Sequence, residues 1–111
     1  MTTISKDAKL ATFINVFTVE PAKQQQLLDL LALATETSVR HVPGFVSATL
    51  HRSLDGTKVA MYAQWRSVEH YQSMRANPVA LPYMQQALAL AKFEPGMYEV
   101  VETYAAANGN A

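Results

Sequence analysis

Three uncharged side chains are the candidates for chemistry in this sequence: the amide of Asn15, the indole of Trp65 and the phenol of Tyr71. Asn15 interrupts an apolar segment, so its amide, if buried, needs a hydrogen-bond partner from the protein or from a ligand carbonyl. Trp65 ends a predicted strand, and Tyr71 lies in the next predicted helix, where it should point back toward the indole. Such groups in apolar surroundings suit a flat ligand with one or two oxygens. Ordinary core packing is the alternative for both aromatic residues.

Other kinds of catalytic or metal site lack the residues that they need. The chain has no cysteine, which excludes disulfides, thiolate zinc sites and cysteine nucleophiles. Its histidines, His41, His51 and His70, are scattered over three predicted elements, so we expect no metal site. The glycines are isolated at predicted turns, and none belongs to a phosphate-binding loop.

Composition indicates one small domain that associates with another copy. The chain has 111 residues, and its formal net charge of +0 gives no reason to expect nucleic acid or a membrane surface as partner. Hydrophobic residues make up 50% and charged residues 16%. A small domain cannot bury that much apolar surface alone, which favours a permanent oligomer over an unusually apolar monomer. We find no signal-peptide pattern and no stretch as long as a transmembrane helix, so we expect a cytoplasmic protein.

Hydrophobic periodicity and turn residues divide the chain into alternating strands and helices. The predicted strands cover residues 10–19, 45–54, 58–66 and 97–104, and the predicted helices cover 22–41, 68–76 and 78–92. This order is β-α-β-β-α-β with the second helical segment split. It is the ferredoxin-like arrangement of an α+β domain, an antiparallel sheet with helices on one face. The domain should span residues 10–104, with disordered ends at 1–9 and 105–111.

The turn signal Asp55-Gly56 sets the predicted pairing of the two middle strands. A two-residue turn there pairs Leu54 with Thr57, and counting back places Val46 opposite Trp65. Because side chains alternate along a strand, the two faces differ in character. The face expected to meet the helices carries Val46, Ala48, Leu50, Met61, Ala63 and Trp65. The other face, which carries Ser47, Thr49, His51, Ala60, Tyr62 and Gln64, is expected to pack on a second copy.

Four segments in order resemble the antibiotic biosynthesis monooxygenase family, over about residues 10–104. They are residues 13–21 (FINVFTVEP), 43–45 (PGF), 51–57 (HRSLDGT) and 62–67 (YAQWRS). The family belongs to the dimeric α/β-barrel superfamily, in which two ferredoxin-like subunits pack sheet against sheet. The resemblance therefore implies a homodimer formed through the sheet faces.

The resemblance also implies a monooxygenase that needs no cofactor and acts on a small aromatic, anthrone or quinol substrate. In that chemistry the deprotonated substrate reduces O2 itself, and the protein stabilises the anion and excludes water. Trp65 and Tyr71 match the family's pocket residues. Where the anthrone-oxidising members carry an Asn four residues before the Trp, this chain has Met61, and Asn15 would supply an amide from the neighbouring strand. We therefore expect Asn15, Trp65 and Tyr71 to be catalytic, and we expect the substrate to contact Met61, Leu50, Phe13, Phe17, Tyr83 and Met84.

A fold does not fix a function, and three other functions found on this fold are alternatives to the oxygenase. The main alternative is a dimeric module without catalysis that binds a ligand or serves a stress response. An isomerase of small lactones is a further alternative. Haem-degrading relatives resemble the chain at Asn15 and Trp65, but they place a His ligand where this sequence has Met84, so haem degradation is disfavoured.

Overall fold

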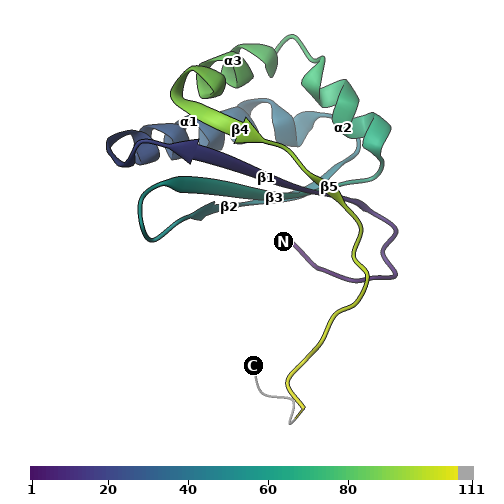
Figure 1. Cartoon of the computed structure of the whole chain (residues 1–111). Coiled ribbons are helices and arrows are strands. Elements are labelled where there is room, and N and C mark those ends of the chain that lie inside the picture. The colour runs from purple at the N-terminus through teal and green to yellow at the C-terminus, as the bar shows by residue number, and fades with distance from the viewer. Residues whose placement is uncertain (108–111) are drawn as a thin grey trace.

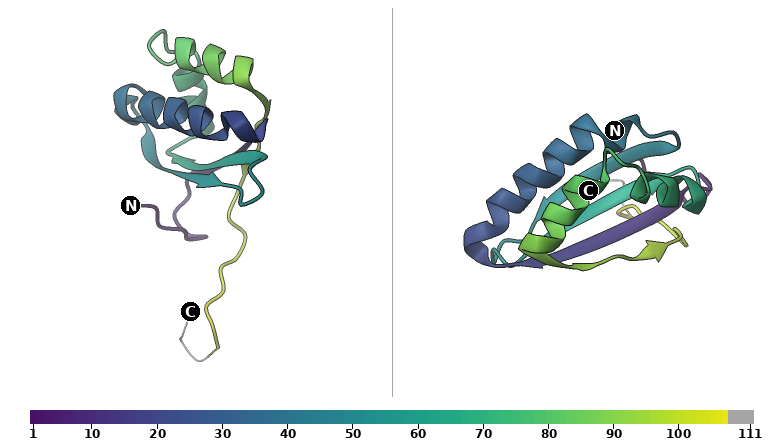
Figure 2. Two further views of the ribbon diagram at one scale, coloured as in Figure 1. Left: turned by 90° about the vertical axis from the view of Figure 1, so that its left-hand side faces the viewer. Right: turned by 90° about the horizontal axis from the view of Figure 1, so that it is seen from above.

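The computed structural model describes residues 1–107, and it is a two-layer α+β structure with its helices on one face of a sheet (Figure 1). Seen from above, the two longer helices lie side by side over the strands (Figure 2). The strands are β1 (Ala11–Val19), β2 (Phe45–Arg52), β3 (Lys58–Trp65), β4 (Ala91–Glu94) and β5 (Met97–Tyr98). The helices are α1 (Gln24–Thr37), α2 (Val68–Arg75) and α3 (Leu81–Leu90), with short 3₁₀ turns at Pro21–Lys23 and Val39–His41.

The strand order confirms the predicted ferredoxin-like fold. The order is β2-β3-β1-β4, every neighbouring pair is antiparallel, and β5 also pairs with β1. The sheet of the single chain is open and does not close into a barrel (Figure 2). No helix within residues 1–107 is long and apolar enough to cross a membrane.

The last part of the chain differs most from its predicted elements. The final helix was expected to reach residue 92, but it ends at Leu90, because Ala91 is already extended and pairs with Val19 of β1. The predicted strand over 97–104 is reduced to Met97–Tyr98, and residues 99–107 form no strand. Residues 91–94 form a strand because they satisfy backbone groups at the edge of β1, a tertiary contact that periodicity does not reveal.

The β2–β3 hairpin confirms most of the predicted register and corrects its two ends. Leu50 faces Met61 and Ala48 faces Ala63, as expected. A β-bulge at Val46 then shifts the pairing, so that Phe45, not Val46, lies opposite Trp65. At the other end the predicted pair of Leu54 and Thr57 is wrong, because the strands end at Arg52 and Lys58 and a five-residue loop, 53–57, joins them.

That loop is held by the side chain of Asp55. One carboxylate oxygen accepts hydrogen bonds from the Thr57 N–H at 3.0 Å, the Thr57 hydroxyl at 2.7 Å and the Ser53 hydroxyl at 2.9 Å. These bonds, the Thr57 N–H first, lower the pKa of Asp55 from 3.8 to about 2, because they stabilise the ionised form. The loop still brings the Ser53 N–H to the Lys58 carbonyl at 3.0 Å, so the register beyond the turn is kept.

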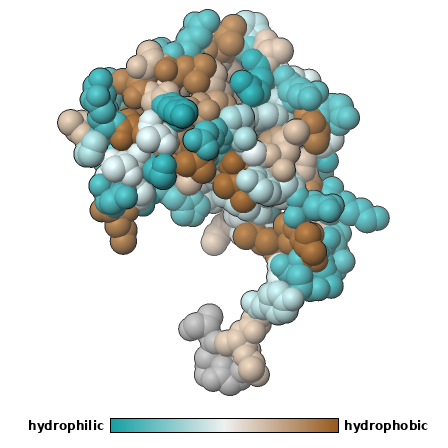
Figure 3. Space-filling view, in the orientation of Figure 1, coloured by the Kyte–Doolittle hydropathy of each residue, from teal (hydrophilic) through white to brown (hydrophobic). Residues whose placement is uncertain are grey.

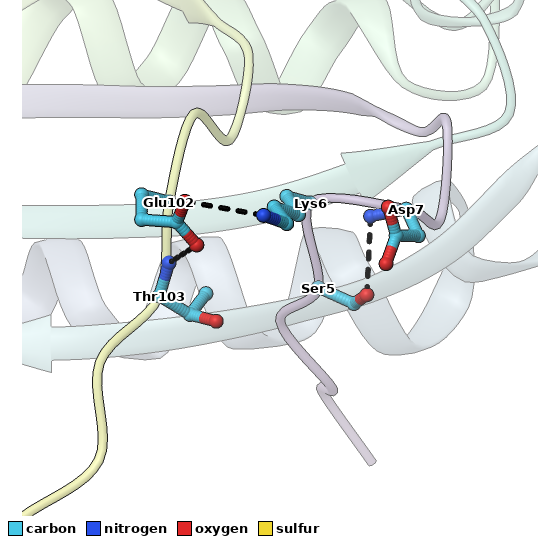
Figure 4. Close-up of polar contacts among 5 residues, drawn as sticks. All are labelled: Ser5, Lys6, Asp7, Glu102 and Thr103. Carbon is cyan, nitrogen blue, oxygen red and sulfur yellow. Dashed lines mark hydrogen bonds and ion pairs between the residues drawn. The ribbon is translucent and has the colours of Figure 1, made fainter.

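Both chain ends leave the domain on the side of the sheet away from the helices (Figure 1). An ion pair between Lys6 and Glu102, 3.1 Å long, joins them across the exposed surface (Figure 4). Nearby, the Ser5 hydroxyl accepts a hydrogen bond from the Asp7 N–H (Figure 4). The predicted disorder of 1–9 and 105–111 stays a prediction, and residues 108–111 of that tail lie outside the described residues.

Candidate active site

An apolar cavity of about 70 Å³ lies between the sheet and the helices. The sheet provides one wall, with Asn15 from β1 and Met61 and Trp65 from β3, and the helices provide the other. Three of the five methionines, Met61, Met74 and Met84, line it. Because methionine side chains are flexible and polarizable, such a wall adapts to the shape of a ligand.

An aromatic cluster centred on Trp65, which is 1% exposed, forms part of the cavity wall. The indole meets the Phe45 ring edge-on at 5.4 Å between centroids and the Tyr71 ring at 6.1 Å. Tyr71 in turn stacks on Phe13, with centroids 3.9 Å apart. Edge-to-face and offset-stacked rings of this kind hold one another in fixed orientations. The cluster therefore fixes the place of both Trp65 and Tyr71.

The start of α2 orients Tyr71 toward this cluster. Ser67 caps the helix, since its hydroxyl accepts a hydrogen bond from the His70 N–H at 3.2 Å. The His70 ring bonds the same hydroxyl at 2.7 Å and packs against Gly44, where a Cβ atom would overlap the imidazole. His70 thus joins α2 to the loop before β2, and it does not line the cavity.

The Tyr71 hydroxyl is a polar group inside the protein without a protein partner. It is buried, and no atom of residues 1–107 forms a hydrogen bond with it. Leaving a buried hydroxyl unsatisfied costs about 1–3 kcal/mol, so native proteins rarely keep one without a reason. The Ser38 and Tyr62 hydroxyls are likewise buried without a partner within residues 1–107, but of the three residues only Tyr71 lines the cavity.

The Asn15 side chain is buried at 6% exposure in the middle of β1. Its Oδ1 accepts a long hydrogen bond, 3.4 Å, from the N–H of Gly96 in the β4–β5 connection. Asn15 lies directly opposite Met61 on β3, and both residues line the cavity. The structure therefore supplies a protein partner for one end of the amide and places the residue at the cavity wall.

Of the residues predicted to bind substrate, Phe17, Met61, Tyr83 and Met84 line the cavity together with the three predicted catalytic residues. Phe13 and Leu50 do not. Phe13 lies under Tyr71, whereas Leu50 packs on the second core cluster, which contains Leu27 and Val59. The Tyr83 hydroxyl accepts a hydrogen bond from Thr37 at 3.1 Å.

The sequence-based prediction of substrate contacts missed Phe93 and Phe45. Arg75 and His70 were further candidates for polar groups of the pocket, and of these two Arg75 lines the cavity. Phe93 stacks on Phe17, with centroids 4.8 Å apart, and the Arg75 guanidinium carbon lies 5.8 Å above the Phe93 ring. Phe93 was missed because β4 was not predicted, and Phe45 because the bulge at Val46 reverses the order of side chains there. The remaining lining residues are small or aliphatic or belong to the helices: Leu31, Ala34, Thr35, Val39, Ala48, Ala63, Met74 and Ala80.

A ferredoxin-like domain with an apolar cavity between sheet and helices, lined also by a few hydrogen-bonding groups, defines the class as a small α+β protein. Comparison with known proteins gives the family. The family model for antibiotic biosynthesis monooxygenases matches residues 11–89. This chain belongs to that family, which confirms the family inferred from the sequence motifs.

Three relatives place the chain within the family. It is 43% identical over 106 residues to tetracenomycin-F1 monooxygenase of Streptomyces glaucescens, covering 96% of this chain and 95% of the relative. It is 29% identical to the monooxygenase ActVA-Orf6 of Streptomyces coelicolor, solved with nanaomycin D, with a TM-score of 0.79 over 91% of this chain and 96% of the other. It is also 29% identical to SnoaB, a cofactor-independent oxygenase from Streptomyces nogalater, with a TM-score of 0.69 over 86% and 97%. These relatives bear out the predicted class of activity, a monooxygenase of the cofactor-independent kind.

Proposed function

We propose that this protein is a cofactor-independent monooxygenase that oxidises a flat, polycyclic phenol or anthrone with O2. The observation that carries the proposal is the buried hydroxyl of Tyr71, a residue of the apolar cavity wall, which has no hydrogen-bond partner within residues 1–107. It is a ready donor for the oxygen of an aromatic anion. Trp65 and Phe45 offer ring surfaces for the flat part of the substrate.

The reaction follows from the substrate's own reactivity. Loss of a proton gives an electron-rich anion, which transfers an electron to O2. The resulting carbon radical and superoxide then combine into a peroxide at that carbon. For a ring CH2 group, elimination of water from the peroxide leaves a ketone, so CH2 and O2 become C=O and H2O. The protein contributes hydrogen bonds to the anion and a cavity that excludes bulk water.

The names of the relatives support an aromatic polyketide as substrate. One acts on tetracenomycin F1, and another holds nanaomycin D in its crystal structure. The cavity of about 70 Å³ is smaller than the roughly 150 Å³ that accommodates benzene in an engineered protein core. We therefore expect Met61, Met74 and Met84 to move when a polycyclic substrate enters.

Oxygen uptake with anthrone, or with a menadiol-type quinol, tests the proposal. We expect uptake well above autoxidation with the wild type and about a hundredfold lower turnover with Tyr71→Phe, since one anion-stabilising donor is lost. Tyr104→Phe is the matched control, because Tyr104 is 91% exposed in the C-terminal segment. Uptake by the wild type that never exceeds the autoxidation rate with either substrate would overturn the proposal.

A ligand-binding module without catalysis is the second candidate function. The observation that favours it is Met61, a thioether at the position where anthrone-oxidising members carry an amide. Trp65 is the only tryptophan and lines the cavity, so its fluorescence reports a ligand there. Saturable quenching by anthrone under nitrogen, combined with uncatalysed oxygen uptake in air, would favour this second function.

We also propose a cytoplasmic homodimer formed through the sheet faces. The face away from the helices carries Ile14, Val16 and Tyr62, and no helix of residues 1–107 lies over it (Figures 1 and 2). Near it, Met97 and Val101 are exposed where the C-terminal segment leaves the domain, a region that is partly apolar in Figure 3. Light scattering should give twice the chain mass, and a monomer at micromolar concentration would contradict the dimer. Cell fractionation tests the location.

A further inference from the structure

The cavity wall contains one charged side chain among the described residues, Arg75. The other polar residues of the wall are Asn15, Thr35, Tyr71 and Tyr83, all uncharged in their ordinary state. The wall thus includes neither a carboxylate nor an imidazole. A substrate that must lose a proton here would find no strong base beside it, so its ionised form has to be favoured in another way.

Arg75 is placed to act on a ligand that Tyr71 also contacts. Arg75 follows Tyr71 by four residues in α2, so the two side chains lie on the same face of the helix. The guanidinium lies over the Phe93 ring, and Phe93 belongs to the cavity wall. Because Arg75 is exposed while Tyr71 is buried, the charge lies at the rim of the cavity and the phenol lies inside it.

The positive charge of Arg75 is not neutralised by a carboxylate within the described residues. The two ion pairs of residues 1–107 are Lys6–Glu102 and Lys23–Glu20, and neither involves Arg75. A guanidinium that lies over an aromatic ring still has the N–H donors around its own edge available to bind an anion. An opposite charge within about 4–6 Å favours the ionised form of an acid, typically by 1–3 pKa units beside an arginine.

We propose that Arg75 binds the oxyanion of the substrate and lowers the pKa of its acidic hydroxyl, so that the enzyme selects substrates that ionise to a phenolate or enolate. The inference rests on the proposed function and deepens it. Proton loss to water then needs no protein base, because the anion is the form that the cavity binds. The substrate's acidic oxygen lies toward the C-terminal end of α2, where Arg75 stands one helical turn beyond Tyr71.

A hydroxyanthraquinone dye tests this inference without turnover, because its colour changes when its phenol ionises. We expect the pKa of the dye bound to wild type to lie about one unit below that of the free dye. Arg75→Gln should remove that decrease, Arg75→Lys should keep part of it, and Arg40→Gln, at an exposed arginine outside the cavity wall, should leave it unchanged. Tyr71 and Tyr83 are the other titratable groups of the wall.

The outcomes separate this inference from the proposed function. An unchanged dye pKa in Arg75→Gln, or a wild type that does not bind the dye, would overturn the role of Arg75 even if oxygen uptake is catalysed. A lowered dye pKa that depends on Arg75, with no catalysed oxygen uptake, would support Arg75 and contradict the oxygenase. With an active enzyme, we expect Arg75→Gln to move the rising limb of kcat against pH upward by about one unit, because kcat reports ionisations in the enzyme–substrate complex.

Discussion

Asn15 and Met61 face each other directly across β1 and β3, and both line the cavity. Opposite residues in an antiparallel pair have Cβ atoms about 4.5–5.5 Å apart. An amide carried by Asn15 therefore reaches nearly the same region of the cavity as one at position 61. The cavity therefore has an amide from β1, that of Asn15, although position 61 on β3 is a methionine.

Exchanging these two residues tests whether they are equivalent. We expect Asn15→Met to lower kcat/KM about tenfold, the usual effect of losing one neutral hydrogen bond. Met61→Asn in that background should recover a large part of the loss. Activity is measured as oxygen uptake, and urea unfolding of each variant separates loss of fold from loss of function, since Asn15 also accepts a bond from the Gly96 N–H. Full activity of Asn15→Met alone would show that the amide has no role.

The Tyr71 hydroxyl should matter for function and not for stability. In Tyr71→Phe the stack on Phe13 is kept, and a buried hydroxyl without a partner in residues 1–107 is removed. We expect the midpoint of urea unfolding to stay the same or rise while turnover falls. A clear decrease in the free energy of unfolding would mean that the hydroxyl has a structural partner in the native protein.

Gly44 should tolerate a side chain far less than Gly56 does. Both have a positive φ, +91° and +82°, which costs alanine about 1–2 kcal/mol. At Gly44 the added Cβ also overlaps the His70 ring, whereas at Gly56 the nearest atom is a Pro21 carbon at 3.4 Å. Overpacking of this kind adds about 1–3 kcal/mol. Thermal unfolding should show Gly44→Ala as the less stable variant.

A double variant at Gly44 and His70 tests whether the overlap with the imidazole is the cause. In the His70→Ala background the steric part of the Gly44→Ala effect should disappear, and the part due to the positive φ should remain. Equal destabilisation of Gly44→Ala with and without the imidazole would mean that backbone strain alone is responsible.

Because of Asp55 in the hairpin loop, the free energy of unfolding should decrease as the pH becomes acidic. Asp55 has a pKa of about 2 in the folded protein, against 3.8 ordinarily. Because the folded-state pKa is the lower one, the contribution of Asp55 is fully present above about pH 4 and is lost as pH falls toward 2. An NMR titration of the carboxyl gives its pKa directly, and Thr57→Val, which removes one donor, should raise it toward 3.8. An ordinary Asp55 pKa in the wild type would contradict the bonding described for the loop.

The sequence alone determined the ferredoxin-like order of strands and helices and most of the pairing between β2 and β3. Alternation along 58–65, the Asp55-Gly56 turn signal and the helical spacing of Leu27 and Leu31 are local patterns, and they fix which side of each strand is apolar. They led to the facing pairs Leu50–Met61 and Ala48–Ala63 and to Asn15, Trp65 and Tyr71 as candidate site residues, which all line one cavity.

Only the tertiary structure decided which further side chains complete that cavity. β4 exists because the backbone of β1 needs a partner at its edge, and this strand brings Phe93 under Arg75. The bulge at Val46 turns Phe45 toward Trp65, and Phe13 lies beneath Tyr71 and outside the wall. Periodicity reports the side of an element on which a residue lies, but contacts between elements distant in sequence decide whether that residue meets a ligand or the core.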